Sequence, residues 1–303
     1  MIDVLTNRYS NSRAGVNGAE TQLNKQAIST STFGKLFTRT VDGDLYAQPL
    51  IVSNLKIGRK IRNVVCLATS RNMVYAFDAD DPLQYLPLWT RSLGPAAPRN
   101  MILPKNPHYT NFGSEVGITS TPVIEPVGRG VGRGGTIFVV AKTLENKLFQ
   151  YKLHALNILN GKDKIPPEQI EATVLNAKRQ RLTFSPQFNL NRPGLLLRDG
   201  VIYVAFGSQA DERPFYGWIM AYDSGTLTQL AVYNTAPDWG EGGVWQSGTG
   251  LAADDEGFVY AVVGNGEKSE ENRKKGIDQP STVTSPVYGN AILKLKLDKK
   301  TVI

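Results

Sequence analysis

The stretch that decides the fold is residues 201–225, VIYVAFGSQADERPFYGWIMAYDSG. Val201 to Phe206 is a short apolar run rich in β-branched and aromatic residues, which predicts a buried strand. A polar loop follows, and residues 218–222 (WIMAY) predict a second strand. Asp223 and the Ser-Gly pair after it predict a tight turn, because Asp accepts hydrogen bonds from the backbone and Gly adopts positive φ.

This unit of strand, loop, strand and turn recurs along the chain. The turn residues are Asp78, Asn157, Asp223 and Asp298, and strand-like runs precede each of them. Their separations exceed the roughly 40 to 50 residues of a compact blade, so the loops are expected to be long. Repeated antiparallel units indicate a β-propeller, in which radial repetition shortens the exposed sheet edges. A β-sandwich with irregular loops is the structural alternative.

The sequence therefore predicts an all-β fold, a β-propeller of four-stranded antiparallel blades that forms a single domain over residues 1–303. About four blades are expected, at roughly 41–95, 115–165, 183–236 and 243–303. These four either close alone or belong to a larger ring that continues beyond the C-terminus. We favour the incomplete ring.

Two segments depart from the strand pattern. Residues 166–181 (PPEQIEATVLNAKRQR) begin with two prolines and end with basic side chains, which predicts a helix. The segment Glu267 to Tyr288 is polar with few apolar residues, and it is predicted to be mobile.

Composition excludes several classes of protein. The formal net charge is +7, from 34 Lys and Arg against 27 Asp and Glu, but the basic residues are scattered, so no nucleic-acid partner is expected. No apolar run is long enough to span a membrane, and the first residues lack a signal-peptide pattern. The chain reads as cytosolic or as a mature region whose leader was removed. Cys66 is the only cysteine, and its apolar surroundings predict a core residue.

Two formal motifs carry no function. Residues 130–135 (GVGRGG) match a nucleotide-binding pattern, but a strand follows them where that motif requires a helix. The two histidines, His108 and His154, are far apart, and no Cys-x-x-Cys or His-Glu-x-x-His occurs. A zinc site is therefore unsupported.

With the repeat established, the chain resembles the quinoprotein alcohol dehydrogenase-like propellers, which are built from pyrroloquinoline quinone (PQQ) repeats. Residues 8–52 (RYSNSRAGVNGAETQLNKQAISTSTFGKLFTRTVDGDLYAQPLIV) are similar to the opening segment of that family. Residues 73–94 (MVYAFDADDPLQYLPLWTRSLG) resemble its repeat signature, in which an Ala-x-Asp turn precedes a strand that carries a Trp.

The resemblance implies a site for PQQ and Ca²⁺. Motif by motif, Glu212 and Asn265 match the Ca²⁺ ligands of the family, and Trp245 matches the tryptophan that forms the floor beneath the quinone. Carboxylate and amide oxygens suit a hard cation, and an indole face offers a flat stacking surface. Each residue also has an ordinary interpretation: a solvated loop carboxylate, a hairpin Asn between glycines, and a core Trp.

In propellers the first strand of each blade lines the central channel. This predicts Gln48, Thr121, Arg192 and Gln246 as funnel residues, and Arg192 as a second candidate for cofactor binding. The predicted partner is a small molecule or a protein at this funnel.

The chain also departs from the family pattern. The adjacent cysteine pair expected ahead of Gly117 is missing, and Tyr46 stands where a cofactor-contacting glutamate is expected. Gly266 and Glu267 follow Asn265 in place of Pro-Trp, and the catalytic aspartate of the family lies later than this chain reaches. The predicted function is therefore a binding or scaffold propeller, with no catalysis by this chain alone. The alternative is a PQQ- and Ca²⁺-dependent alcohol or sugar dehydrogenase seen as a partial chain. The resemblance implies a secreted or periplasmic location.

Overall fold

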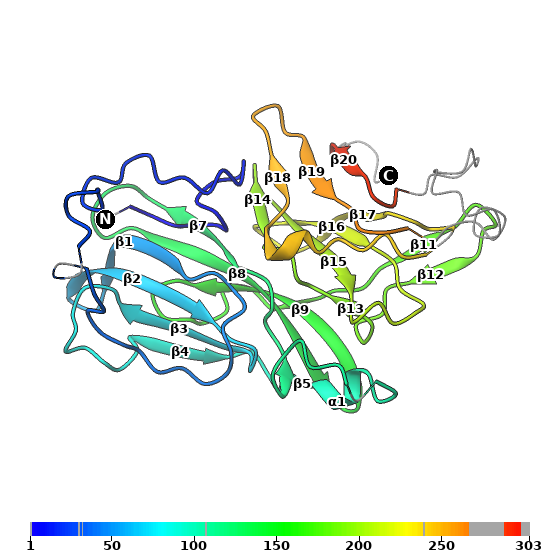
Figure 1. Cartoon of the computed structure of the whole chain (residues 1–303), viewed down its shortest axis with the longest axis horizontal. Coiled ribbons are helices and arrows are strands. Elements are labelled where there is room, and N and C mark those ends of the chain that lie inside the picture. Colours follow the sequence, from blue (N-terminus) through cyan, green and yellow to red (C-terminus); the bar gives the residue numbers. More distant parts are fainter. Residues whose placement is uncertain are drawn as a thin grey trace.

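The computed structural model describes residues 2–29, 31, 33–106, 108–238, 240–266 and 288–297. Four antiparallel sheets follow one another in chain order, from the blue and cyan first sheet to the orange and red fourth (Figure 1). Helical structure in the described ranges consists of α1 (Arg99–Ile102) and the 3-10 turn η1 (Gln246–Gly248). The fold is nearly all-β, as the sequence predicts.

The first two sheets have four strands each, in chain order across the sheet. The first consists of β1 (Leu50–Ile57), β2 (Lys60–Ala68), β3 (Met73–Asp78) and β4 (Trp89–Ser92). The second consists of β7 (Val123–Val127), β8 (Gly134–Glu145), β9 (Leu148–Asn157) and β10 (Glu168–Gln169).

The third sheet begins with two short strands, and both pair with the same neighbour, β15. Its strands are β13 (Asn189–Leu190), β14 (Leu196–Arg198), β15 (Val201–Ser208), β16 (Trp218–Asp223) and β17 (Gln229–Asn234). The described part of the fourth sheet is β18 (Ala252–Ala253), β19 (Val259–Val262) and β20 (Ile292–Leu295). Two small hairpins join β5 (Ala97–Pro98) to β6 (Glu115–Val116), and β11 (Thr173–Leu175) to β12 (Arg181–Thr183).

The predicted turn residues occupy equivalent positions. Asp78, Asn157 and Asp223 each end the strand before the last one of their sheet. In each case the side-chain oxygen accepts a hydrogen bond from the backbone N–H two residues later, at 2.9 to 3.0 Å. The repeat inferred from the sequence is confirmed at these three turns. The fourth, Asp298, lies outside the described residues.

Alternation along the strands places one core between each pair of neighbouring sheets. Ile137, Val139 and Ala141 of β8 face the first sheet, whereas Phe138 and Val140 of the same strand face the third. The third sheet in turn packs on the fourth through a separate cluster. Successive side chains of a strand point to opposite faces, so a sheet buried on both faces needs apolar residues at nearly every position. Cys66 is buried in the first of these cores, as predicted.

The N-terminal segment crosses the first strand of every sheet. Val4 exchanges backbone hydrogen bonds with Ile51 of β1, and the Leu5 carbonyl accepts from the N–H of Ile124 in β7. Further on, the Asn11 side chain donates to the Leu197 carbonyl of β14, and its own carbonyl accepts from Ala253 of β18. Residues 4–11 thus bind all four sheets, and the dark blue trace in Figure 1 reaches β14.

Arg13 completes this attachment from a buried position. Its guanidinium donates to the backbone carbonyls of Leu195 and Leu251 at 3.1 and 2.8 Å, and to the Thr6 hydroxyl at 2.6 Å. Burial lowers the pKa of Arg13 to about 10, so the group is charged at neutral pH and fully engaged as a donor.

The helix predicted over residues 166–181 is wrong. This segment contains β10, β11 and the first residue of β12, with the hairpin turn at 176–180. The helix prediction gave too little weight to two features that favour strands. Ile170 is fully buried against the second sheet, and Thr173 and Val174 are β-branched. The segment predicted to be mobile, Glu267 to Tyr288, lies outside the described residues except for Tyr288. In the described ranges no helix is both apolar enough and long enough to cross a membrane.

Replacing Arg13 tests the N-terminal attachment. Arg13→Met keeps the volume of the side chain but leaves the Leu195 and Leu251 carbonyls without their donor. We expect the free energy of unfolding to fall by about 3 kcal/mol, because each buried group left unsatisfied costs about 1–3 kcal/mol. Urea denaturation measures the change, and Arg59→Met, at an exposed turn, is the matched control. Equal stability of the two variants would contradict the attachment.

His154 of β9 gives the fold a pH dependence. Its Nδ1 lies 3.0 Å from Asp163 Oδ1, and Asp163 also accepts a hydrogen bond from Arg91 of β4. Burial lowers the pKa of His154 from its usual 6.5, although Asp163 opposes the shift. The folded protein therefore holds a neutral imidazole where the unfolded chain holds a partly protonated one.

We expect the stabilisation from neutral His154 to be complete above pH 6.5 and to be lost progressively as the pH falls below that value. The slope from one such group is at most about 1.4 kcal/mol per pH unit, because the unfolded state binds more protons in this window. Urea denaturation between pH 7.5 and 5 should show a flatter profile for His154→Gln than for the wild type. His108→Gln, at the exposed second histidine, should retain the wild-type slope.

Candidate functional site

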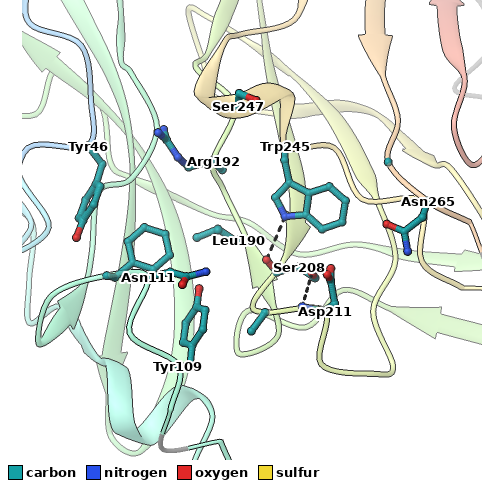
Figure 2. Close-up of a pocket in the computed structure, with 13 residues that line it drawn as sticks. Tyr46, Tyr109, Asn111, Leu190, Arg192, Ser208, Asp211, Trp245, Ser247 and Asn265 are labelled. Carbon is teal, nitrogen blue, oxygen red and sulfur yellow. Dashed lines mark hydrogen bonds between the residues drawn. The ribbon is translucent and has the colours of Figure 1, made fainter.

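A cavity of about 600 Å³ opens where loops of the first, third and fourth sheets meet the segment that follows α1. Figure 2 shows Tyr46, Tyr109 and Asn111 on one side and Trp245, Asp211 and Asn265 on the other. The lining residues are Tyr46, Tyr109, Asn111, Phe112, Leu190, Arg192, Ser208, Ala210, Asp211, Trp245, Ser247, Gly264 and Asn265.

Three glycines hold the Trp245 indole in place. A Cβ at Gly207, Gly243 or Gly264 would lie 2.4 to 2.5 Å from an indole atom, closer than any side chain tolerates. The ring NH also donates to the Ser208 carbonyl at 3.3 Å. Trp245 is nevertheless only half-buried, because it lines the cavity. Backbone from the third and fourth sheets therefore supports the ring, Phe215 makes an edge contact with it at a centroid distance of 6.0 Å, and part of the remaining surface faces the cavity.

Arg192 brings a positive charge to the cavity. Its guanidinium packs against the backbone of Gly248, where positive φ and the lack of space both require glycine. One nitrogen, Nη1, donates to the Thr119 carbonyl at 3.1 Å. Within the described part of the chain no carboxylate pairs with this guanidinium, which leaves most of its five N–H donors available. Burial lowers the pKa of Arg192.

The opposite wall is aromatic. Phe112 makes edge contacts with Tyr46 and Tyr109, at centroid distances of 4.8 and 6.2 Å. The Tyr109 hydroxyl donates to Gln209 Oε1 at 3.1 Å, and burial raises the pKa of Tyr109 to about 12. Burial also raises the pKa of Tyr46. Both phenols are protonated at neutral pH, and the Tyr46 hydroxyl donates to Asp44 Oδ2 at 3.4 Å.

The acidic groups lie on the Trp245 side. Asp211 faces the cavity, and its Oδ1 accepts from the Ser208 hydroxyl at 2.9 Å (Figure 2). Asn265 also lines the cavity, and its Nδ2 donates to Glu241 Oε2 at 2.9 Å. The other oxygen of the Glu241 carboxylate accepts from Arg213, so that carboxylate is already neutralised.

The structure brings together three of the four predicted site residues. Trp245, Arg192 and Asn265 line the same cavity. Glu212 does not, since it borders a separate small hollow of about 180 Å³ that Arg213 also lines. Its neighbour Asp211 faces the main cavity instead. Ala210 and Asp211 both have positive φ, and this turn of the backbone directs Asp211 rather than Glu212 toward the cavity. The sequence carried no signal for that turn.

The other three predicted funnel residues form hydrogen bonds within the protein, and Gln48 binds the N-terminal segment. Gln48 Oε1 accepts from Asn7 Nδ2 and from the N–H of Arg8, and Thr121 Oγ1 accepts from the N–H of Gln48. Gln246 bonds to Gly250 and Val262 in its own sheet. Among the four predicted funnel positions, only Arg192 lines the described cavity.

Solved structures with the same arrangement of sheets are quinoprotein dehydrogenases. One is a quinohemoprotein alcohol dehydrogenase from Pseudomonas putida HK5, with a TM-score of 0.61, 16% identity, and coverage of 99% of this chain and 39% of that one. Another is the quinohemoprotein alcohol dehydrogenase from Comamonas testosteroni (TM-score 0.50, 14% identity, 89% and 36% coverage). A europium-containing methanol dehydrogenase gives a TM-score of 0.52 at 15% identity, with 91% and 45% coverage.

The chain shares their fold. At these identities the likeness concerns the β-propeller architecture alone, and the chain spans less than half the length of each of these enzymes. No family model matches the sequence, and no curated protein does.

The resemblance implies two bound groups, PQQ and Ca²⁺, and the cavity does not suit them equally. For PQQ, a planar polyanion, the indole on its glycine cradle offers a stacking surface, and Arg192 offers an unpaired cation. For Ca²⁺, which takes six to eight oxygen ligands, the cavity offers the Asp211 carboxylate and the Asn265 amide, while Arg213 engages Glu241. Within the described residues no three His, Cys, Asp or Glu side chains form a group that could hold a metal. The donor set suits PQQ and does not suit Ca²⁺.

Gly207→Ala tests the support of Trp245. The added methyl would lie 2.5 Å from the indole Nε1, so the ring must move or the strand must shift. We expect the free energy of unfolding to fall by about 1–3 kcal/mol, with a changed near-UV circular dichroism spectrum. Gly134→Ala is the matched control, because a Cβ there meets no atom within 4 Å. Indistinguishable behaviour of the two variants would show that the indole is not held by the glycine backbone.

Proposed function

We propose that this chain is a ligand-binding β-propeller domain whose cavity takes a planar, anionic small molecule. The ligand stacks on Trp245 and places a carboxylate against Arg192. The observation that carries the proposal is the Arg192 guanidinium, a half-buried cation that faces a cavity and bonds to one carbonyl. A desolvated charge with unused donors is costly unless a ligand supplies the counter-charge.

PQQ is the member of this ligand class that we propose first. Support comes from the shared fold and from the joint placement of Trp245, Arg192 and Asn265 on one cavity. In this arrangement Arg192 would pair with a ligand carboxylate, Trp245 would support the ring plane, and Tyr46 and Tyr109 would line the opposite wall. Bound PQQ would supply the redox chemistry of its quinone.

A dehydrogenase, of which this chain forms one part, is the second candidate. It is favoured by the same joint placement of residues that match the PQQ-site motifs. Binding without catalysis is preferred for these 303 residues, because Tyr46 lines the cavity where the family pattern has a glutamate. The secreted or periplasmic location stays a prediction from the resemblance, as does a protein partner at the funnel.

Titration with PQQ tests the proposed function. We expect the wild-type protein to bind PQQ with quenching of tryptophan fluorescence, measured in parallel by calorimetry. Arg192→Gln should weaken binding at least tenfold, about 1.4 kcal/mol, because the carboxylate loses its charged partner. Arg198→Gln, which removes an arginine paired with Asp199 on the surface, should bind like the wild type. Absence of binding, or equal affinity of all three proteins, would refute the proposal.

Adding a primary alcohol and an artificial electron acceptor to the PQQ-loaded protein separates the two candidates. Turnover would favour the dehydrogenase, and binding without turnover would favour the binding domain.

A further inference from the structure

Glu241 stands directly behind the cavity wall, between Asn265 and Arg213. Its side chain is about 9% exposed, and its carboxylate is the acceptor for both neighbours. The backbone fixes its position, since its N–H donates to Phe215 and its carbonyl accepts from Gly217. Asn265 is anchored as well, because its carbonyl accepts from the Gly242 N–H at 2.8 Å. From the cavity outward, three side-chain groups therefore form a row: the Asn265 amide, the Glu241 carboxylate and the Arg213 guanidinium.

Within this row, Arg213 supplies the positive charge that a metal ion would otherwise have to supply. A buried carboxylate requires a cation beside it, and Arg213 is that cation, reaching Glu241 from the loop between β15 and β16. Glu241 in turn orients the Asn265 amide by accepting from its Nδ2. In the described part of the cavity wall, Asp211 is the remaining carboxylate and Arg192 the remaining cation, so their charges balance without an added ion.

We infer that this site works without a metal ion, and that Arg213 replaces the metal by neutralising Glu241 and thereby fixing Asn265. The inference rests on the proposed function for the identity of the ligand, but its metal component stands on the ion pair alone. It separates this chain from the neighbour described as europium-containing, and it gives Arg213 a positioning role that the sequence did not suggest.

Calorimetric titration with CaCl₂ alone tests the metal component. We expect the wild type to show no binding tighter than about 1 mM, the weak limit of protein calcium sites. Arg213→Gln removes the guanidinium and leaves the Glu241 carboxylate unneutralised beside the Asn265 amide, so we expect Ca²⁺ binding to appear, tightened at least tenfold. Arg213→Lys keeps the charge and should resemble the wild type. The double variant Arg213→Gln, Glu241→Gln should lose the acquired binding.

Two results would overturn the inference. One is Ca²⁺ binding by the wild type tighter than about 1 mM that Glu241→Gln or Asn265→Ala abolishes. The other is a folded Arg213→Gln variant, verified by thermal unfolding, that gains no Ca²⁺ binding. The wild-type titration decides the first point even where the variant fails to fold.

Titration with PQQ in the presence of CaCl₂ or of the chelator EGTA tests the role in ligand binding. Equal affinity within twofold in the two buffers supports metal independence, and a tenfold loss in EGTA refutes it. If PQQ does not bind in either buffer, the proposed function fails, while the titrations with CaCl₂ alone still decide whether Arg213 takes the place of the metal.

Discussion

The structure depends on the contact between the N-terminal segment and the first strand of each sheet. Val4, Leu5, Asn11 and Arg13 together bind four strands that lie up to about two hundred and forty residues further along the chain. First strands have free N–H and C=O groups on one edge, and such groups are costly when buried without partners. The N-terminal segment supplies those partners with backbone groups at Val4 and Leu5 and with the side chains of Asn11 and Arg13. Closing such long loops costs conformational entropy, so the attachment stabilises the sheets only because its donors and acceptors are matched.

The candidate site inherits its geometry from this packing. Trp245 lies on the backbone of Gly207 in β15 and of Gly264 after β19, so the indole is supported by two sheets at once. A shift of either strand by one residue would exchange its two faces and bring a side chain under the ring. The inter-sheet cores prevent that shift, because residues on both faces of the strands are buried. The packing of the sheets therefore fixes the position of the Trp245 indole, and the loops add the charged groups around it.

The sequence predicted what local chemistry determines. Turns at Asp78, Asn157 and Asp223 follow from Asp and Asn side chains that accept from the backbone, and the burial of Cys66 follows from its apolar neighbours. Placement of Trp245 and Asn265 at one cavity was accessible through motif order, and that of Arg192 through its position on the first strand of a blade. Features that depend on tertiary contacts were not accessible. The segment 166–181 forms strands and not a helix, because Ile170 is buried against the second sheet. At residues 210 and 211, where φ is positive, the loop places Asp211 and not Glu212 at the cavity.

Several arginines of the described residues have their partners within the fold. Arg62, Arg133 and Arg213 each pair with a carboxylate. The guanidinium of Arg13 donates hydrogen bonds to backbone carbonyls and to a hydroxyl. These groups are explained by the fold alone, because their charges or donors are satisfied within it. Arg192 is more buried than a surface arginine yet bonds to one carbonyl, beside an aromatic floor that three glycines keep clear. A half-buried guanidinium with unused donors beside a flat indole is the combination of groups on which the proposed planar, anionic ligand rests.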